Sequence, residues 1–168
     1  MSDQHGQRVK LDKIDRKILR DLQAEGRITN VELAKRAGIS APPCLRRVRA
    51  LEVDGYVKGY HAEIDATKLG FKEMFFALVG LDSQNQAVLT AFEEAVRDWE
   101  DVRECHMIRG GGDFLLKVVA KDKEHRDALT MRLTEAPHVE TVSTLETIRT
   151  SKNKPGVPVD IDVEIEHA

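Results

Sequence analysis

Apolar side chains recur at three- and four-residue steps through the first third of the chain, which is the period of helices with one buried face. The first such series is Leu11, Ile14, Ile18 and Leu22. Asp12 stands at its start, where a carboxylate caps or complements a helix N-terminus, and Gly26 follows its end. The pattern therefore predicts a first helix between Asp12 and Gly26.

Residues 29–51, TNVELAKRAGISAPPCLRRVRAL, contain two helix starts and one tight turn. Thr29 is a good N-cap, and Glu32 follows at the spacing of a capping box. Gly38 can end that helix in a left-handed conformation, and Ser40 can cap the next helix. Two short helices about three residues apart are typical of a helix-turn-helix, so this segment points to DNA.

The second of these helices is predicted to have an inward and an outward face. The inward face consists of Leu45, Val48 and Leu51, with Ala41 and Cys44 at its edge. Arg46 points away from the core and is expected to enter the major groove, while Arg47 and Arg49 flank it and are expected to contact the DNA backbone. The predicted DNA-binding residues are Thr29, Asn30, Ser40, Ala41, Pro42, Pro43, Arg46, Arg47 and Arg49. An arginine-rich helix face alone would favour a solvated charged surface, but the capping and turn signals reverse that preference.

After Gly55 the spacing of apolar residues changes from that of helices to that of strands. Residues 56–65 alternate weakly and predict one or two short strands, a wing or a linking ribbon. The rest of the chain predicts strand, helix, strand, strand, helix, strand, with strands at 74–81, 102–108, 114–120 and 139–149. This is a ferredoxin-like βαββαβ order. The predicted fold class is α+β, with an N-terminal winged helix-turn-helix before the ferredoxin-like domain.

The predicted division of the chain is a flexible N-terminus at 1–9, a DNA-binding domain at 10–61, a linker at 62–73, a second domain at 74–150 and a tail at 151–168. The net charge also differs between the DNA-binding part and the remainder of the chain. Residues 1–61 contain 13 Lys and Arg against 8 Asp and Glu, so the net charge of −3 hides +5 in the first part and −8 in the remainder. A basic lobe joined to an acidic one is expected when only one lobe meets phosphates.

The composition argues against several other classes of protein. No apolar run is long enough to cross a membrane and no signal-peptide pattern is present, so a cytoplasmic location is expected. Cys44 and Cys105 form neither a disulfide framework nor a zinc-binding spacing, and both are expected to be small buried hydrophobes. No metal or other cofactor is predicted.

Two predicted strands, 74–81 and 114–120, are nearly continuous apolar runs. A sheet covered by helices on one face only should instead alternate apolar and polar residues. The second face therefore needs a cover, and the simplest cover is the same sheet of another subunit in an isologous dimer. Such a dimer would present two helix-turn-helix units to a pseudo-palindromic DNA site.

Three stretches, LDKIDRKILRDLQAEGRITNVELAKRAGIS, PCLRRVRALE and GY at 59–60, are together similar to the Lrp/AsnC family of feast/famine transcriptional regulators. The resemblance covers roughly residues 10–150. It implies that the βαββαβ domain is of the RAM/AsnC type and senses an effector. It also implies dimers that often assemble into octamers, and an amino acid bound between sensing domains. In the family a glycine and, three residues on, an aspartate follow the second strand of this domain, and they correspond to Gly110 and Asp113.

The loop RGGGD, residues 109–113, has chemistry that suits an amino acid. Glycines let backbone N–H groups approach a carboxylate, and an aspartate accepts hydrogen bonds from an ammonium group. The predicted effector-binding residues are Arg109, Gly110, Gly111, Gly112 and Asp113, to which the resemblance adds Thr144 and Glu146 from the region that faces the loop across the subunit interface. The alternative is an ordinary hairpin turn, rich in glycine because a tight connection needs positive φ.

Two other functions stay open at this point. Siroheme decarboxylases resemble the family and use histidines and basic residues, and His106 and Arg109 lie near the loop. No paired acid and base or metal cluster is apparent in the sequence, so no enzymatic activity is expected. An architectural protein that wraps DNA without an effector is the second alternative. In the tail, residues 159–166 alternate strictly and predict an edge strand that adds to a sheet in the oligomer, with disorder as the alternative.

Overall fold

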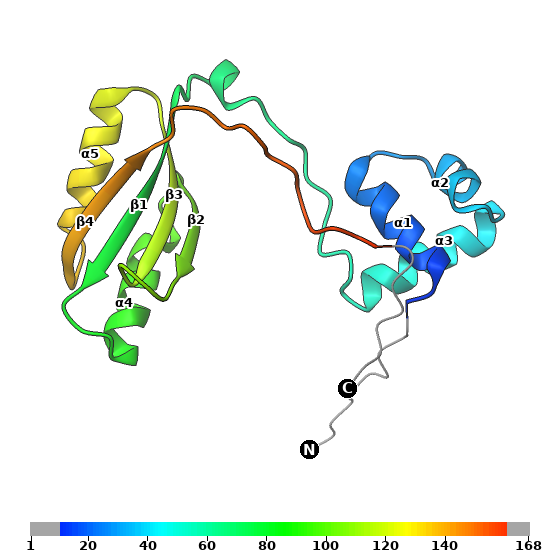
Figure 1. The fold of residues 1–168 in the computed structure, drawn as a ribbon, viewed down its shortest axis with the longest axis horizontal. Coiled ribbons are helices and arrows are strands. Elements are labelled where there is room, and N and C mark those ends of the chain that lie inside the picture. Colours follow the sequence, from blue (N-terminus) through cyan, green and yellow to red (C-terminus); the bar gives the residue numbers. More distant parts are fainter. Residues whose placement is uncertain (1–10, 161–168) are drawn as a thin grey trace. The chain divides into compact units, whose positions relative to one another are not determined.

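The computed structural model describes residues 11–160 of the chain. Within this range the chain forms two compact units, one from residues 11–63 together with 153–160, the other from residues 64–152. We call them the helical unit and the sheet unit (Figure 1). The predicted N-terminus at 1–9 and most of the predicted strand at 159–166 lie outside the described residues.

The helical unit contains the three helices that the sequence predicts. They are α1 (Lys13–Ala24), α2 (Asn30–Ala37) and α3 (Ala41–Val53). Their inward faces meet in one core, whose buried side chains are Ile18, Leu33, Ala34, Ala37, Cys44, Val48 and Leu51. Only residues 38–40 separate α2 from α3, which is the predicted helix-turn-helix spacing.

Short polar side chains fix the starts of α1 and α2. Asp12 accepts a hydrogen bond from the Asp15 N–H (2.8 Å), and the Asp15 carboxylate accepts one from the Asp12 N–H (3.2 Å), which completes a capping box. At α2, Thr29 Oγ1 accepts from the Glu32 N–H at 3.2 Å as predicted. The Glu32 carboxylate instead accepts from Arg36 Nε at 3.1 Å. The capping box predicted at α2 is therefore only half formed.

The turn between α2 and α3 depends on Gly38. Its φ is 78°, in the left-handed region, and its N–H donates to the Lys35 carbonyl at 3.2 Å to close the last turn of α2. Ser40 is the N-cap of α3 as predicted, although its side chain makes no capping hydrogen bond. The positions of the helix boundaries were therefore predictable from the local sequence.

One expectation for the helical unit is wrong. Residues 56–65 contain no strand. A ribbon needs a partner for its hydrogen bonds, and a short isolated hairpin is marginal in water. Cys44, expected to be a small buried hydrophobe at the edge of the inward face, is fully buried as expected, whereas Leu45 on that face is only partly buried. Burial raises the pKa of the Cys44 thiol, as expected for a packing residue.

The sheet unit follows the predicted βαββαβ order. Its strands are β1 (Glu73–Leu81), β2 (Val102–Met107), β3 (Phe114–Ala120) and β4 (Val139–Glu146), and its helices are α4 (Gln86–Arg97) and α5 (Lys123–Thr134). The strands lie side by side in the order β2-β3-β1-β4, and each neighbouring pair is antiparallel. This is the ferredoxin-like arrangement. A short 3-10 helix, η1 (Ala66–Leu69), precedes β1 and was not predicted.

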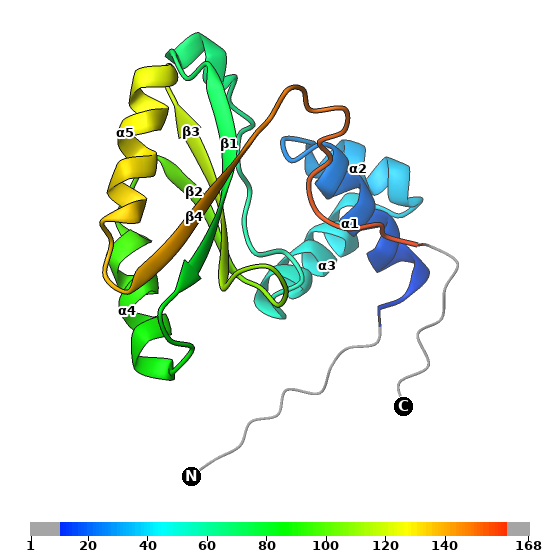
Figure 2. The same ribbon diagram turned by 60° about the vertical axis from the view of Figure 1, so that its left-hand side comes forward.

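Both helices cover the same face of the sheet (Figures 1 and 2). Every second residue along most of β1 and throughout β3 is buried against α4 and α5, and the rings of Phe92 and Phe114 meet with centroids 4.8 Å apart. The residues between them, on the open face, are only partly buried and, apart from Lys117 on β3, mostly apolar; they include Phe76, Leu78, Leu115 and Val119. The predicted second apolar face is therefore present.

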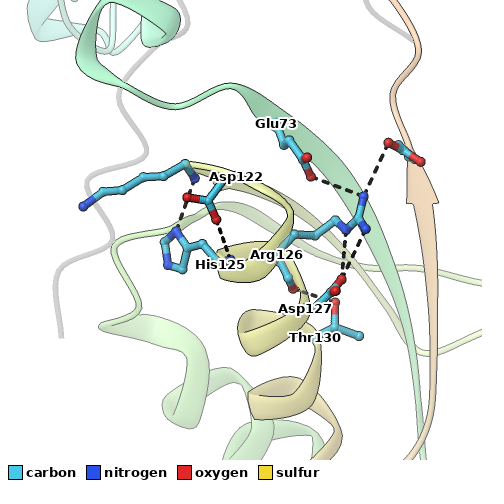
Figure 3. Close-up of polar contacts among 8 residues, drawn as sticks. Glu73, Asp122, His125, Arg126, Asp127 and Thr130 are labelled. Carbon is cyan, nitrogen blue, oxygen red and sulfur yellow. Dashed lines mark hydrogen bonds and ion pairs between the residues drawn. The ribbon is translucent and has the colours of Figure 1, made fainter.

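Polar contacts at α5 join the start of β1 to the end of β4, which lie at the same end of the sheet (Figure 3). Asp122 caps α5 by accepting from the His125 N–H at 2.8 Å. Arg126, in the first turn, lies 3.2 Å from a carboxylate oxygen of Glu73 and 3.4 Å from one of Glu146. Because Glu73 begins β1 and Glu146 ends β4, Arg126 joins the points where the chain enters and leaves the sheet.

The second cysteine differs from its prediction. Cys105 is exposed, because β2 is an edge strand, most of whose residues remain accessible to solvent. Partial desolvation of its sulfur, and then the charge of Glu93, raise the pKa of the Cys105 thiol to about 11. No helix among the described residues is long and apolar enough to span a membrane.

Candidate functional site

The outer face of α3 presents the basic side chains that the sequence predicts for DNA contact. Arg46 and Arg49 are exposed, and within residues 11–160 neither guanidinium has an ion-pair partner. Pro42 is exposed and Pro43 half-buried at the entrance of the helix, where small rings leave room for a close approach. Unneutralised guanidinium groups on such a helix can pair with phosphate or with guanine in the major groove.

Arg47 has partners that the sequence reasoning missed. Its Nη1 donates to Asp12 Oδ2 and to Asp15 Oδ1, both at 2.7 Å. Bonds to Asp15 and then to Asp12 raise the pKa of Arg47. Partial burial acts to raise the pKa of Asp12, but hydrogen bonds from the Asp15 N–H and from Arg47 outweigh burial and lower this pKa. Arg47 therefore fixes α3 against the start of α1 instead of extending a free charge.

The remaining predicted DNA-binding residues lie at the two helix starts. Thr29 and Asn30 form the start of α2, and Ser40 and Ala41 form the start of α3. Thr29, Asn30 and Ser40 are exposed, and Ala41 is half-buried. Free backbone N–H groups at a helix start suit contacts to phosphate oxygens; the start of α2 can offer them, whereas Pro42 and Pro43 in the first turn of α3 have no N–H.

The loop between β2 and β3 folds back onto the end of β1. The Ile108 N–H donates to the Asp113 carbonyl at 2.9 Å, and the Asp113 N–H donates to the Val79 carbonyl at 2.8 Å. Gly110 has a φ of 142°, which favours glycine. A Cβ on Gly112 would lie 3.0 Å from the Val79 carbonyl oxygen. Two of the three glycines are thus required by the turn itself, as the hairpin interpretation expects.

The Asp113 side chain is buried, at 9% exposure, and is engaged within the chain. Its Oδ2 accepts a hydrogen bond from the Leu81 N–H at 2.7 Å, and its Oδ1 accepts one from Gln84 Nε2 at 2.8 Å. These bonds fasten the end of β1 to the loop. An ionised carboxylate offers about four lone-pair sites, so acceptor capacity remains for an ammonium group.

A cavity of about 440 Å³ opens beside this loop. Its lining residues are Gln84, Leu89, Met107, Ile108, Arg109, Gly110, Gly112 and Asp113. The cavity thus combines the apolar side chains of Leu89 and Met107 with the charges of Arg109 and Asp113. Four of the predicted effector residues meet here. Gln84 and Leu89 were missed because only the folded chain brings them to the loop, and Met107 and Ile108, which directly precede the loop, were assigned only to a strand.

Thr144 and Glu146 do not join this cavity within one chain. Both lie on β4, at the opposite edge of the sheet from β2. Thr144 is opposite Ala77 in the strand register, and Glu146 is paired with Arg126. A contribution from either residue would have to come from a second copy of the chain.

His106, the histidine considered for catalysis, lies outside the cavity lining. Its Nε2 is 3.0 Å from Glu104 Oε2, and Lys117 Nζ donates to Glu104 Oε1 at 2.9 Å. The bonds from Lys117 and then from His106 lower the pKa of Glu104. The strand register puts this group on the open face of the sheet.

Comparison with protein families matches both parts of the chain. A model of winged helix-turn-helix DNA-binding domains matches residues 11–58. A model of the Lrp/AsnC ligand binding domain matches residues 74–157. The first match covers all three helices of the helical unit, and the second covers the sheet except Glu73, the first residue of β1.

Individual relatives extend this likeness over most of the chain. The leucine-responsive regulatory protein of Rhizobium meliloti is 51% identical over 147 residues, which is 87% of this chain and 94% of that protein. A crystal structure of an AsnC family transcriptional regulator from Agrobacterium tumefaciens is 31% identical and superposes with a TM-score of 0.84, covering 91% of this chain and 100% of that one. A transcriptional regulator from Neisseria meningitidis, in complex with L-methionine, is 30% identical with a TM-score of 0.85, covering 89% and 97%.

Proposed function

Because the chain belongs to the Lrp/AsnC family of DNA-binding transcriptional regulators and is not an enzyme, we propose that it binds an apolar amino acid at the 109–113 loop and changes its DNA-binding or oligomeric state in response. The observation that carries this proposal is the cavity beside the loop, where a buried carboxylate, glycine backbone and apolar side chains line one space. The complex of the Neisseria meningitidis relative with L-methionine supports an amino acid as the ligand class.

Each end of a zwitterion would find a complementary group in this cavity. The ammonium group pairs with Asp113, which retains acceptor capacity beyond its bonds to Leu81 and Gln84. The carboxylate pairs with the backbone N–H groups of the glycine loop and with Arg109. The apolar side chain packs against Leu89 and Met107, which line the same space.

For DNA binding we propose that Arg46 reads the major groove and that Arg49 contacts the backbone. Thr29, Asn30, Ser40, Ala41, Pro42 and Pro43 complete the surface that meets the duplex. Arg47 contributes indirectly, by holding α3 in place through Asp12 and Asp15.

We also propose that a second copy of the chain covers the open face of the sheet. The apolar side chains there include Phe76, Leu78, Leu115 and Leu145, and Leu145 is 54% exposed. An exposed apolar face of this kind is typical of a subunit interface. A dimer would pair two helix-turn-helix units for a pseudo-palindromic site. It would also allow Thr144 and Glu146 of one copy to approach the loop of the other. The same dimer is the building block of the octamer that the family resemblance implies.

Titration calorimetry with the twenty L-amino acids tests the sensing function directly. The wild-type protein is expected to bind at least one apolar amino acid. Asp113→Asn removes the charge that pairs with the ammonium group and should weaken binding by roughly 10- to 100-fold, the range of a hydrogen bond to a charged group. Asp82→Asn is the matched control, because Asp82 is exposed, pairs with His138 and does not line the cavity.

Footprinting on the promoter of the chain's own gene, with and without the amino acid, then tests the response. The expected result is a protected region whose extent or midpoint changes on adding the ligand. No heat with any of the twenty amino acids, together with normal protection of DNA, would identify an architectural protein and overturn the sensing function.

A further inference from the structure

The chain returns to the helical unit after β4, and Gln23 of α1 holds it there. Gln23 Nε2 donates to the Val157 carbonyl at 2.7 Å, and the Val157 N–H donates to Gln23 Oε1 at 3.1 Å. One side-chain amide thus satisfies both backbone polar groups of one residue, as a neighbouring strand would. Such a two-bond pairing specifies the position of Val157 along α1.

Gly156 makes this pairing possible. Its φ is 72°, a conformation that side chains other than glycine rarely adopt. A Cβ at this position would also overlap Gln23 Oε1 and Cδ. The backbone conformation therefore favours glycine here, and a Cβ would in addition push the Gln23 amide away from its position beside Val157.

A second anchor lies three residues further along the chain. Arg16, which is only 9% exposed, donates from Nη1 to the Asp160 carbonyl at 3.3 Å. Between the two anchors, Val157, Pro158 and Val159 line one groove of the helical unit with residues of α1 that include Leu19 and Leu22. Residues 156–160 therefore combine polar anchors on α1 with apolar side chains that line this groove, of which Val157 is 67% exposed.

We propose that residues 156–160, which we call the latch, fix the returning chain onto α1 and carry ligand-dependent changes in the sheet unit to the DNA-binding helices. The chain passes between the two units twice, before β1 at residues 63–64 and after β4 at residues 152–153. Arg126 pairs with Glu73 and Glu146, the strand ends from which these two connections leave. Without the latch the helical unit would be attached by one connection only. The coupling part of this inference rests on the proposed sensing function, while the docking part does not.

Hydrogen exchange of the full chain tests the docking. Gly156→Ala should release the latch and, by removing two hydrogen bonds, speed exchange of the Val157 amide and of the second half of α1 by up to about tenfold. Gly70→Ala is the matched control, because Gly70 also has a positive φ, 89°, but a Cβ added there would meet no other atom within 4 Å. Exchange in α1 that is the same for Gly156→Ala, Gly70→Ala and wild type overturns the docking.

A double-mutant cycle separates the steric clash from backbone strain. Gln23→Ala removes both the hydrogen bonds and the atoms that a Cβ on residue 156 would meet. In that background Gly156→Ala should add only the effect of Gly70→Ala, because the latch is already released. If the two substitutions instead add in full, Gly156 and Gln23 act independently and the latch is wrong.

The coupling is tested with L-methionine as the probe. Where calorimetry detects binding, L-methionine should change exchange in α1 of the wild type, and Gly156→Ala should abolish that change while still binding the amino acid. An equal change in both proteins, or none in the wild type, overturns the coupling. If calorimetry detects no amino acid at all, the proposed sensing function fails and the coupling fails with it, whereas the docking is still decided by Gly156→Ala without ligand.

Discussion

Substituting Arg47 by alanine should destabilise the helical unit more than it weakens contacts to DNA. One guanidinium nitrogen lies 2.7 Å from both Asp12 and Asp15, and the Asp15 side chain is only 10% exposed. A hydrogen bond to a charged group contributes about 1.5 to 3 kcal/mol, and an exposed ion pair such as that to Asp12 adds at most about 1 kcal/mol. The expected loss is therefore about 2 kcal/mol, most of it from Asp15.

Thermal unfolding followed by circular dichroism measures this loss. In a unit of this size, 1 kcal/mol corresponds to roughly 4 to 8 °C in Tm, so Arg47→Ala should lower the transition of the helical unit by roughly 8 to 16 °C. Arg46→Ala is the control on the same helix, since Arg46 is exposed and should change stability by less than about 0.5 kcal/mol. Combining Arg47→Ala with Asp15→Ala should cost less than the sum of the two single losses.

Binding to DNA at several salt concentrations separates the two arginines further. Arg46→Ala should weaken binding to a specific site by roughly 1 to 3 kcal/mol if Arg46 reads a base. Arg47→Ala, measured well below its transition, should leave the salt dependence of binding unchanged. An Arg47→Ala protein with wild-type Tm whose salt slope falls by about 1 would show that Arg47 contacts a phosphate, and the structural role would be refuted.

Three further predictions concern Asp113, Cys105 and Asp12. Asp113→Ala leaves the Leu81 N–H without its acceptor and should lower the free energy of unfolding, measured by chemical denaturation, by about 1 to 3 kcal/mol. Asp113→Asn should lower it less, because the Gln84 amide can rotate to accept from the new NH₂ group. Equal losses in the two variants would contradict this prediction. Because its pKa is raised from 9.0 to about 11, the Cys105 thiol should contain about a hundredfold less thiolate at neutral pH in the folded than in the unfolded chain. It should therefore be alkylated correspondingly more slowly in the folded chain. Equal alkylation rates, after correction for exposure, would count against the raised pKa. The folded state lowers the pKa of Asp12 from 3.8, so the stabilisation from the Asp12–Arg47 pair is present above that value and is lost as the pH falls through the native pKa. The difference in unfolding free energy between wild type and Arg47→Ala should therefore shrink below about pH 4. A difference that stays constant in acid would contradict the pairing of Asp12 with Arg47.

Features that depend on neighbours in sequence were predicted well. Thr29 caps α2 and Gly38 turns the chain with a φ of 78°, because an N-cap and a left-handed turn involve atoms only a few residues apart. The order of strands and helices in the sheet unit was equally predictable, since each element has its own apolar period. The strand expected within residues 56–65 failed because a strand forms only with a partner, and weak alternation does not supply one.

Features that depend on distant residues were not predictable. A helical wheel places Arg47 beside Arg46, but its function depends on Asp12 and Asp15, which lie 35 and 32 residues earlier. The bonds between Gln23 and Val157 span 134 residues, and nothing in the local sequence around either residue indicates the other. The cavity at the loop likewise needs Leu89 from α4, which was identified only as part of an amphipathic helix.

The geometry of Asp113 limits how a ligand can act. Its carboxylate already accepts from Leu81 and Gln84, and because it has acceptor sites to spare, a bound ammonium group would add a third bond without displacing either. Ligand binding would then tighten the junction between the loop and β1 instead of releasing it. A ligand shifts an equilibrium only by its differential affinity for the two states, so the favoured state must be the one in which this junction is closed. Since β1 begins at Glu73, where Arg126 also holds Glu146 at the end of β4, a change in β1 reaches both connections to the helical unit at the same point.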